Sequence, residues 1–400
     1  MRIGIVTEYS RPWPGGISEH VHHEAVELRK RGHHVVIVTG PASGDGAREA
    51  SRDEPDVVRL GFEIRFTSNG AASRMVLGRA VIGLRGELRR LGLDVVHIHA
   101  PMDPVLGWAS LAASEVTTVG TFHASFSPSL LWNALFQWLR PISGRLFARL
   151  HGRIAVSREA ERCISHYFPA AYELIPNGVD TERFRPDLPP IEVLDDDRPT
   201  ILFVGRADPR KGLPLLLEAF ETLRGRIPGL RLVVVGARRD ELEPALARLD
   251  PDLPRDILFA GYVSAADLPR YYAGCTLFCS PATGQESQGI VLLEAMAAGR
   301  PPVAFSIPGY RDVVSHACDG WLVDEVGATP LADSLTELLS NSALLTELGA
   351  AGRKTALGYS WPTVAERLEG HFKTAMARRL GSGSPANPAP ASPTSTGGTQ

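Results

Sequence analysis

The feature that most constrains the fold is residues 279–299, with the sequence CSPATGQESQGIVLLEAMAAG. A short apolar run ends at Cys279, a loop containing proline and glycine follows, and an apolar segment begins after Gly289. This order predicts a strand, a loop and a buried helix, with Ser287 as the helix N-cap. We expect the first backbone amides of that helix to form an anion site. They belong to Gln288, Gly289 and Ile290.

Two carboxylates accompany this helix. Glu286 precedes it, and Glu294 lies inside it among apolar neighbours. A helix that is apolar all round is buried, so a carboxylate within it needs a hydrogen-bonding partner. The sequence leaves two partners open, namely a hydroxyl group of a ligand or an arginine of the same protein.

Strands and helices alternate on both sides of a Pro- and Asp-rich linker. Before the linker, strands are predicted at residues 2–6, 34–38, 94–100 and 117–122, with a helix from residue 17 to Gly32. After it, strands are predicted at 200–204, 232–235, 257–260 and 277–279, with a helix at 213–223. This alternation predicts two parallel-sheet α/β domains that face one cleft.

Composition narrows the classes of function. A chain of 400 residues, 44% of them hydrophobic, can form two domains, and a net charge of -3 does not indicate a nucleic-acid partner. Four scattered cysteines predict no disulfide framework and suit a reducing, cytoplasmic setting. The N-terminus is expected to be a strand and not a signal peptide, and no apolar run is long enough to span a membrane. Residues 381–400 carry no charged side chain and are expected to be disordered.

The loop GRADPRKG follows the strand at 200–204. We expect it to lie at the same sheet edge as the loop before the Glu294 helix. Arg206, Lys211 and the start of that helix would then bind a diphosphate. The alternative is a solvated basic loop.

Histidines and glycines of the first half give weaker indications. His123 directly follows the strand at 117–122, which favours a role in the site over a satisfied loop histidine. A metal site that uses His97 and His99, or His20 with its neighbours His22 and His23, lacks a convincing third ligand. Gly15 and Gly16 would let a ligand approach the backbone, or would only form a tight turn.

Taken together, these motifs resemble the retaining glycosyltransferases of family GT4, which have the GT-B fold. The resemblance rests on the loop 206–211, ESQGIVLLEAMAAG at 286–299, PGG at 14–16, TFH at 121–123 and IPNGVD at 175–180. Within this family the chain is most similar to actinobacterial phosphatidylinositol mannosyltransferases, on MRIGIV, PGGISEHV, GTFHAS and RPISGRLFARLHGRIAVS.

The resemblance implies two doubly wound Rossmann-like domains. The acceptor-binding domain would comprise residues 1–180 and a crossover helix at 361–380, with a linker at 181–198 and the nucleotide-sugar-binding domain at 199–360. It also implies three sets of site residues. The donor site would contain Gly15, Gly16, Arg206, Lys211, Tyr262, Val263, Glu286, Ser287, Gln288, Gly289, Ile290 and Glu294. The acceptor site would contain Tyr9, Gly16, His20 and His123, and the catalytic residues would be His123, Arg206, Lys211 and Glu286.

The resemblance further implies transfer of a hexose, with mannose from GDP-mannose expected, to a lipid such as a phosphatidylinositol. The nucleotide sugar would be a co-substrate, with no metal and no other cofactor. Two positions depart from the family pattern, because Gln288 replaces a phenylalanine and residues 11–13 (Arg-Pro-Trp) replace an acidic residue. Another nucleotide sugar with a soluble or polysaccharide acceptor is the alternative, followed by a non-catalytic nucleotide-sugar-binding module. A nicotinamide dehydrogenase is disfavoured, because a GxGxxG motif with an acidic residue about 20 positions on is missing.

Residues 77–91 and 136–153 combine arginines with apolar and aromatic side chains. Such segments suit the surface of an anionic membrane, which would place the protein peripherally on the inner face of the plasma membrane. Ordinary helices with one packed face explain the same pattern. The oligomeric state is not indicated by the sequence.

Overall fold

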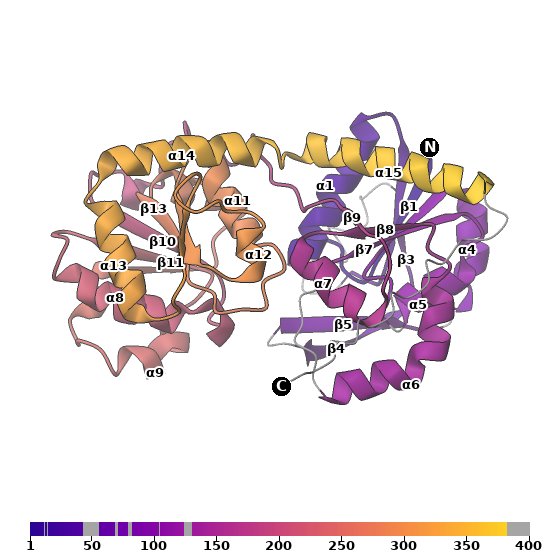
Figure 1. Cartoon of the computed structure of the whole chain (residues 1–400), viewed down its shortest axis with the longest axis horizontal. Coiled ribbons are helices and arrows are strands. Elements are labelled where there is room, and N and C mark those ends of the chain that lie inside the picture. The colour runs from indigo at the N-terminus through magenta and orange to yellow at the C-terminus, as the bar shows by residue number, and fades with distance from the viewer. Residues whose placement is uncertain are drawn as a thin grey trace, which may run out of the picture.

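The computed structural model describes residues 1–11, 13, 15–42, 56–68, 71–78, 82–103, 105–123 and 130–381. These residues form two α/β domains that lie side by side, each built on its own parallel sheet (Figure 1). The predicted pair of doubly wound domains is therefore confirmed. Of the tail expected at 381–400, all but residue 381 lies outside the described residues.

The described part of the N-terminal domain has a seven-stranded parallel sheet in the order β3-β2-β1-β6-β7-β8-β9. Its strands are β1 (Arg2–Thr7), β2 (His34–Thr39), β3 (Val57–Arg59), β6 (Val95–His99), β7 (Thr117–Phe122), β8 (Gly152–Ala155) and β9 (Glu173–Leu174). An antiparallel hairpin of β4 (Phe62–Ser68) and β5 (Ala71–Leu77), which the sequence analysis did not predict, accompanies this sheet.

Helices cover both faces of the N-terminal sheet. On one face, α1 (Gly16–Lys30) packs beside α15 (Trp361–Gly381), and Val21, Leu28 and Phe372 share one apolar core. The second apolar core draws on four other helices. These are α4 (Leu84–Leu91), α5 (Leu106–Ala113), α6 (Leu130–Phe147) and α7 (Arg158–Tyr167).

The C-terminal domain has a parallel sheet in the order β12-β11-β10-β13-β14-β15. Its strands are β10 (Thr200–Val204), β11 (Arg231–Val235), β12 (Ile257–Gly261), β13 (Leu277–Ser280), β14 (Pro302–Phe305) and β15 (Trp321–Val323). Its helices are α8 (Leu213–Arg224), α9 (Glu243–Leu246), α10 (Leu268–Ala273), α11 (Ile290–Ala297), α12 (Pro308–Arg311), α13 (Ala328–Leu339) and α14 (Ser342–Leu357). Alternation of strand and helix makes these strands parallel, because each crossover helix returns the chain to the same end of the sheet.

Helix α15 joins the two halves of the chain. It follows α14 of the C-terminal domain and runs along the N-terminal domain, where it contacts α1, β7 and β8 (Figure 1). Among the described residues, none of the helices has the length and apolar character needed to cross a bilayer.

Each sheet has a point where neighbouring strands send their helices to opposite sides. In the C-terminal sheet this point lies between β10 and β13, which pair in parallel through Ile201 and Leu277. In the N-terminal sheet it lies between β1 and β6. Ligands of such sheets bind beyond the carboxyl ends of the strands at these points. The fold therefore directs attention to the loops that follow β10, β13, β1 and β6.

Candidate functional site

The loops after β10 and β13 meet, as the sequence predicted. Lys211 Nζ lies 2.6 Å from Glu286 Oε1, and the Thr283 amide donates to the Arg210 carbonyl at 2.9 Å. Gly212 permits this approach. It has a φ of 69°, and a Cβ there would lie 1.8 Å from the Pro281 carbonyl oxygen. A cation and a carboxylate are thereby fixed at one edge of the C-terminal sheet.

Arg206 lies in the same loop, beside Asp208. Its guanidinium lies 3.8 Å from the Asp208 carboxylate, which also accepts from Arg210 at 2.7 Å. The Arg206 side chain is 45% exposed, whereas that of Lys211 is 23% exposed. Lys211 is thus held in the interior of the site, and Arg206 lies at its solvent side.

The start of α11 differs from the prediction. Gly289 and not Ser287 is the N-cap, and the helix begins at Ile290 without a capping side chain. Gly289 adopts a φ of 85°, and a Cβ there would lie 2.5 Å from the Tyr310 ring. Only glycine fits this close, left-handed turn, and Ser287, which does not cap the helix, lines the cavity instead.

Glu294 has a partner that neither sequence interpretation named. The Tyr272 hydroxyl donates to Glu294 Oε2 at 2.9 Å. Desolvation by burial raises the pKa of Glu294 from 4.5 to about 7, and the Tyr272 hydrogen bond opposes this shift. Because Glu294 remains partly exposed, it can still reach a ligand. No local pattern could reveal Tyr272, since it comes from α10.

Tyr262 and Val263, predicted to meet the nucleotide base, follow β12 at the same edge of the sheet. Tyr262 is 73% exposed and Val263 is half-buried. Neither position is obstructed, so an incoming base could stack or pack there.

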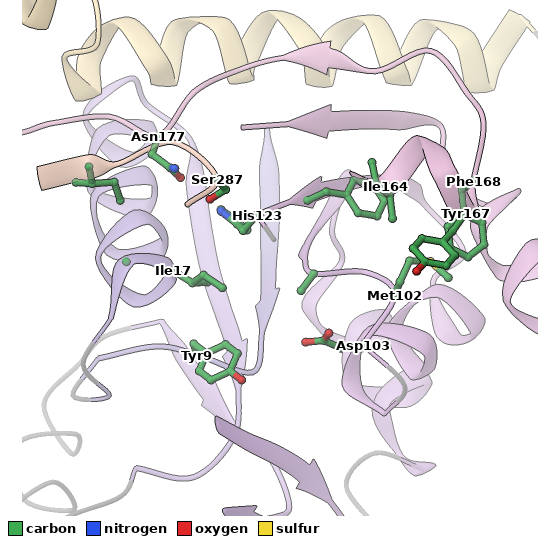
Figure 2. A pocket seen from close by; sticks show the side chains of 14 residues that line it. Tyr9, Ile17, Met102, Asp103, His123, Ile164, Tyr167, Phe168, Asn177 and Ser287 are labelled. Atoms are coloured by element: carbon green, nitrogen blue, oxygen red, sulfur yellow. The ribbon is translucent and has the colours of Figure 1, made fainter. Parts of the chain in front are cut away.

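A cavity of about 450 Å³ lies between the two domains (Figure 2). Tyr9, Gly16 and His123 line it from the N-terminal domain, while Ser287 and Ile290 line it from the C-terminal domain. Gly16 is in close contact with α11, because a Cβ at this position would lie 3.3 Å from Ile290. The structure therefore brings together predicted residues from both halves of the chain.

Another part of this cavity was not predicted from the sequence. Figure 2 shows Asp103 and Met102 opposite His123, beside a group of apolar side chains from α7 and its end. That group contains Ile164, Tyr167 and Phe168. Burial raises the pKa of Asp103 to about 7. Its position just after β6, at the end of a parallel strand, was the signal that could have identified it.

Glu8 is a second buried carboxylate near the cavity. Its oxygens accept from the amides of Val76, at 2.8 Å, and Leu106, at 3.3 Å. Desolvation, followed by the nearby charge of Asp103, raises the pKa of Glu8 to about 7. Glu8 thereby ties the loop after β1 to the hairpin and to α5.

The structure buries His20, which was predicted to bind the acceptor. It is only 2% exposed and does not line the cavity. Its Nδ1 lies 2.8 Å from Asn177 Oδ1, and its Nε2 faces Glu24. The residue lies on the buried face of α1.

Glu24 contacts two histidines of β6, and a third histidine lies next to them. It is fully buried and lies 2.6 Å from His97 and 3.0 Å from His99, and His99 in turn lies 2.8 Å from His123. Desolvation lowers the pKa of His99 to about 3, and it also lowers that of His123, so both rings are neutral. The i, i+4 spacing of His20 and Glu24 was the available sequence signal for this cluster.

Gln288 is only 2% exposed, and its side chain is directed toward the first domain. Its Oε1 accepts from the Asn177 backbone amide at 2.8 Å and from Asn177 Nδ2 at 2.7 Å. Its Nε2 donates to the Asn177 carbonyl at 3.2 Å. The side chain of Gln288 thus bonds the segment that links the domains, and the expected donor contact of this residue is the one through its backbone amide.

The chain matches two family descriptions, one for each domain. Residues 14–183 match Glycosyltransferase Family 4, and residues 184–355 match Glycosyl transferases group 1.

Curated relatives match along nearly the whole chain. A Phosphatidyl-myo-inositol mannosyltransferase of Mycobacterium tuberculosis is 35% identical over 382 residues, which cover 94% of this chain and 97% of the relative. A protein of the same name from Propionibacterium freudenreichii is 30% identical over 94% of this chain and 95% of the relative. A GDP-mannose-dependent alpha-(1-6)-phosphatidylinositol monomannoside mannosyltransferase of M. tuberculosis is 35% identical over 52% of this chain and 57% of the relative.

Solved structures share the fold at low sequence identity. A glycosyltransferase from Rickettsia africae has a TM-score of 0.75 at 19% identity, covering 94% of this chain and 98% of that one. Anabaena HepE, solved in complex with UDP, has a TM-score of 0.74 at 19% identity, covering 94% and 100% of the two chains. The predicted GT-B architecture is confirmed by these likenesses.

Proposed function

Because this chain belongs to glycosyltransferase family 4, we propose that it transfers mannose from GDP-mannose to a phosphatidylinositol-type lipid, with retention of configuration. The observation that carries this assignment is the 35% identity across both domains with a relative named Phosphatidyl-myo-inositol mannosyltransferase. The choice of GDP-mannose follows the name of a second relative.

The donor diphosphate is proposed to bind between Lys211, Arg206 and the start of α11. Lys211 is already oriented by its 2.6 Å contact with Glu286, so it loses little freedom when it binds phosphate. The helix begins without a capping side chain, which leaves backbone amides available to an anion. Glu294 is placed one helix turn further, where it can accept a hydrogen bond from a ribose hydroxyl.

The reaction breaks the bond between sugar C1 and the diphosphate oxygen. Negative charge gathers on the diphosphate, and Lys211, Arg206 and the helix end stabilise this charge more in the transition state than in the ground state. The acceptor hydroxyl attacks C1 from the same face, and its proton passes to the departing phosphate oxygen. Glu286 is proposed to hold Lys211 and the sugar in place, without forming a covalent bond.

The acceptor is proposed to enter the cavity between the domains. There His123 and Tyr9 provide polar groups, and the opposite wall combines Asp103 with apolar side chains such as Met102, Ile164 and Phe168. Asp103 lies on this side and can accept a hydrogen bond from an acceptor hydroxyl when it is ionised. Such a mixed lining suits a polyol that is attached to an apolar group.

Contact with an anionic membrane surface is proposed for the end of α6. Arg140, Ile142 and Arg145 are exposed there, and Ile142 is 53% exposed. The arginines of α4 suit this role less well, because Arg89 and Arg90 are paired with Glu115 and Glu87 at 2.5 Å. The basic segment at 136–153 is also not one helix, since α6 ends at Phe147 and Arg153 belongs to β8. The side chains of 136–138 and residues 79–81 of the other segment lie outside the described residues.

The test is a panel of donors with one acceptor at a time. The full chain is incubated with GDP-mannose, other GDP-sugars, UDP-sugars or ADP-sugars, and with vesicles that contain phosphatidylinositol. We expect release of GDP and formation of a mannosylated lipid, both dependent on the vesicles. Faster turnover of a UDP- or ADP-sugar, or transfer to a soluble acceptor only, would contradict the assignment.

A further inference from the structure

We propose that His20, Glu24 and His99 form a binding site for one divalent metal ion, with Zn²⁺ the ion that suits them best. The site lies inside the N-terminal domain, between α1 and β6, and Asn177 connects it to Gln288 in the loop before α11. It does not depend on which sugar or acceptor the enzyme uses. Its ion would hold the fold and would take no part in diphosphate binding.

The three donor atoms converge. Glu24 Oε2 lies 3.0 Å from His99 Nε2 and 3.4 Å from His20 Nε2, and all three atoms lie within 4.8 Å of one another. Ligand bonds of about 2.0–2.2 Å in a tetrahedral zinc site place neighbouring donors about 3.3–3.6 Å apart. Two imidazole nitrogens and one carboxylate oxygen are a donor set that zinc accepts.

The position of the proton on the His20 ring follows from nearby backbone groups. The Asn177 amide donates to Gln288 Oε1, and the Asn177 carbonyl accepts from Gln288 Nε2, which fixes both ends of the Gln288 side chain. Asn177 Nδ2 must then donate to the same Oε1, so Asn177 Oδ1 faces His20. An oxygen acceptor at 2.8 Å requires a proton on His20 Nδ1.

This assignment leaves His20 Nε2 without a satisfactory partner. The atom is buried and makes no hydrogen bond, although Glu24 Oε2 is 3.4 Å away. With the proton on Nδ1, a neutral His20 ring presents a lone pair at Nε2, which faces the negative charge of Glu24. A metal ion shared by His20 Nε2, His99 Nε2 and Glu24 Oε2 satisfies all three atoms.

The remaining ring nitrogens and the other carboxylate oxygen have the partners typical of a metal site. His20 Nδ1 donates to Asn177, His99 Nδ1 pairs with His123 Nε2, and Glu24 Oε1 pairs with His97 Nδ1 at 2.6 Å. Such outer hydrogen bonds fix the orientation of ligating groups and raise their basicity. Through His99, an ion here would also fix the position of His123 at the cavity wall.

The experiment measures metal content without donor or lipid. The full chain, carrying no histidine tag, is produced in minimal medium with Zn²⁺ or Co²⁺, and the metal is quantified after gel filtration. We expect about one ion per chain and a Co²⁺ visible spectrum of a low-coordinate nitrogen and oxygen site. E24Q and H99Q should each lower the occupancy at least about tenfold, whereas H22Q, on the same helix, should retain the ion.

Thermal unfolding provides a second measurement that needs no variant. A strong chelator should lower the unfolding temperature of the wild-type chain, because the ion binds only the folded state. Two results would overturn the proposal. One is a wild-type chain that carries no ion and is insensitive to chelator, which would assign the contact to a proton shared by His20 and Glu24. The other is occupancy lost in H22Q but kept in E24Q. Metal content and unfolding temperature are both measured without donor or lipid, so their outcome does not depend on whether the chain transfers mannose. The two proposals therefore stay distinguishable.

Discussion

Replacing Lys211 with methionine tests the proposed source of catalytic power. The change keeps the length of the side chain and removes one cation from the diphosphate site. At about 4 Å from a phosphate oxygen, with an effective dielectric constant of about 20, a unit charge interacts by about 4 kcal/mol. Part of this is already present in the ground state. We therefore expect kcat to fall by about 10²–10³, which corresponds to about 2.7–4 kcal/mol.

The same change also leaves Glu286 without its partner. The Glu286 side chain is 15% exposed, so the lost pair should lower the free energy of unfolding by roughly 1–3 kcal/mol. Urea unfolding measures this part separately from catalysis. Single-turnover mannosyl transfer with saturating GDP-mannose measures the chemical step.

Lys30 provides a matched control, because it forms a pair of similar length with Glu27, at 2.7 Å, within α1. The Glu27 side chain is 11% exposed, about as little as that of Glu286, so K30M should lower the free energy of unfolding by a comparable amount and should leave kcat unchanged. A folded K211M enzyme that retains kcat within a factor of about three would refute the assignment of Lys211 to the diphosphate.

Three further predictions concern Glu294, the pair of Gln288 and Asn177, and the exposed end of α6. Burial raises the pKa of Glu294 to about 7, so the folded enzyme holds a proton between pH 4.5 and 7 that the unfolded chain releases, and native stability should fall as pH rises through that window. The ionised form of Glu294 accepts a hydrogen bond from the ribose hydroxyl, so kcat/KM for GDP-mannose should rise with increasing pH, with an apparent pKa near 7. If the same rise persists in E294Q, the pH dependence belongs to another group. Q288A and N177A should each lower the free energy of unfolding by about 1–3 kcal/mol in urea titrations. The double variant should lose about 0.5–3 kcal/mol less than the sum of the two single losses, because the two side chains bond each other. Additive losses would mean that the two side chains do not act together. Charge reversal in R140E/R145E should reduce co-sedimentation with phosphatidylinositol vesicles and leave co-sedimentation with neutral vesicles unchanged, and equal binding by the wild type and the variant would exclude this end of α6 as the membrane contact.

Part of this site is determined by local sequence. The apolar run before Cys279 and the glycines around the next loop specify a strand that gives way to a helix, and the same holds for the loop that ends at Lys211. Parallel strands then bring both loops to one edge of the sheet, because every crossover returns the chain to the same end. For this reason the meeting of Lys211 and Glu286 could be predicted without a structure.

Only the tertiary structure decided what each buried polar group contacts. Tyr272 reaches Glu294 from α10, and Asn177 reaches Gln288 from the other domain. His99 reaches Glu24 of α1 from β6. These partners are far apart in sequence, and no periodicity links them. The N-cap of α11 was missed for a related reason, since it is the Tyr310 ring that requires glycine at position 289. Local periodicity fixes which residues face inward, whereas the identity of their neighbours depends on how the helices and sheets pack.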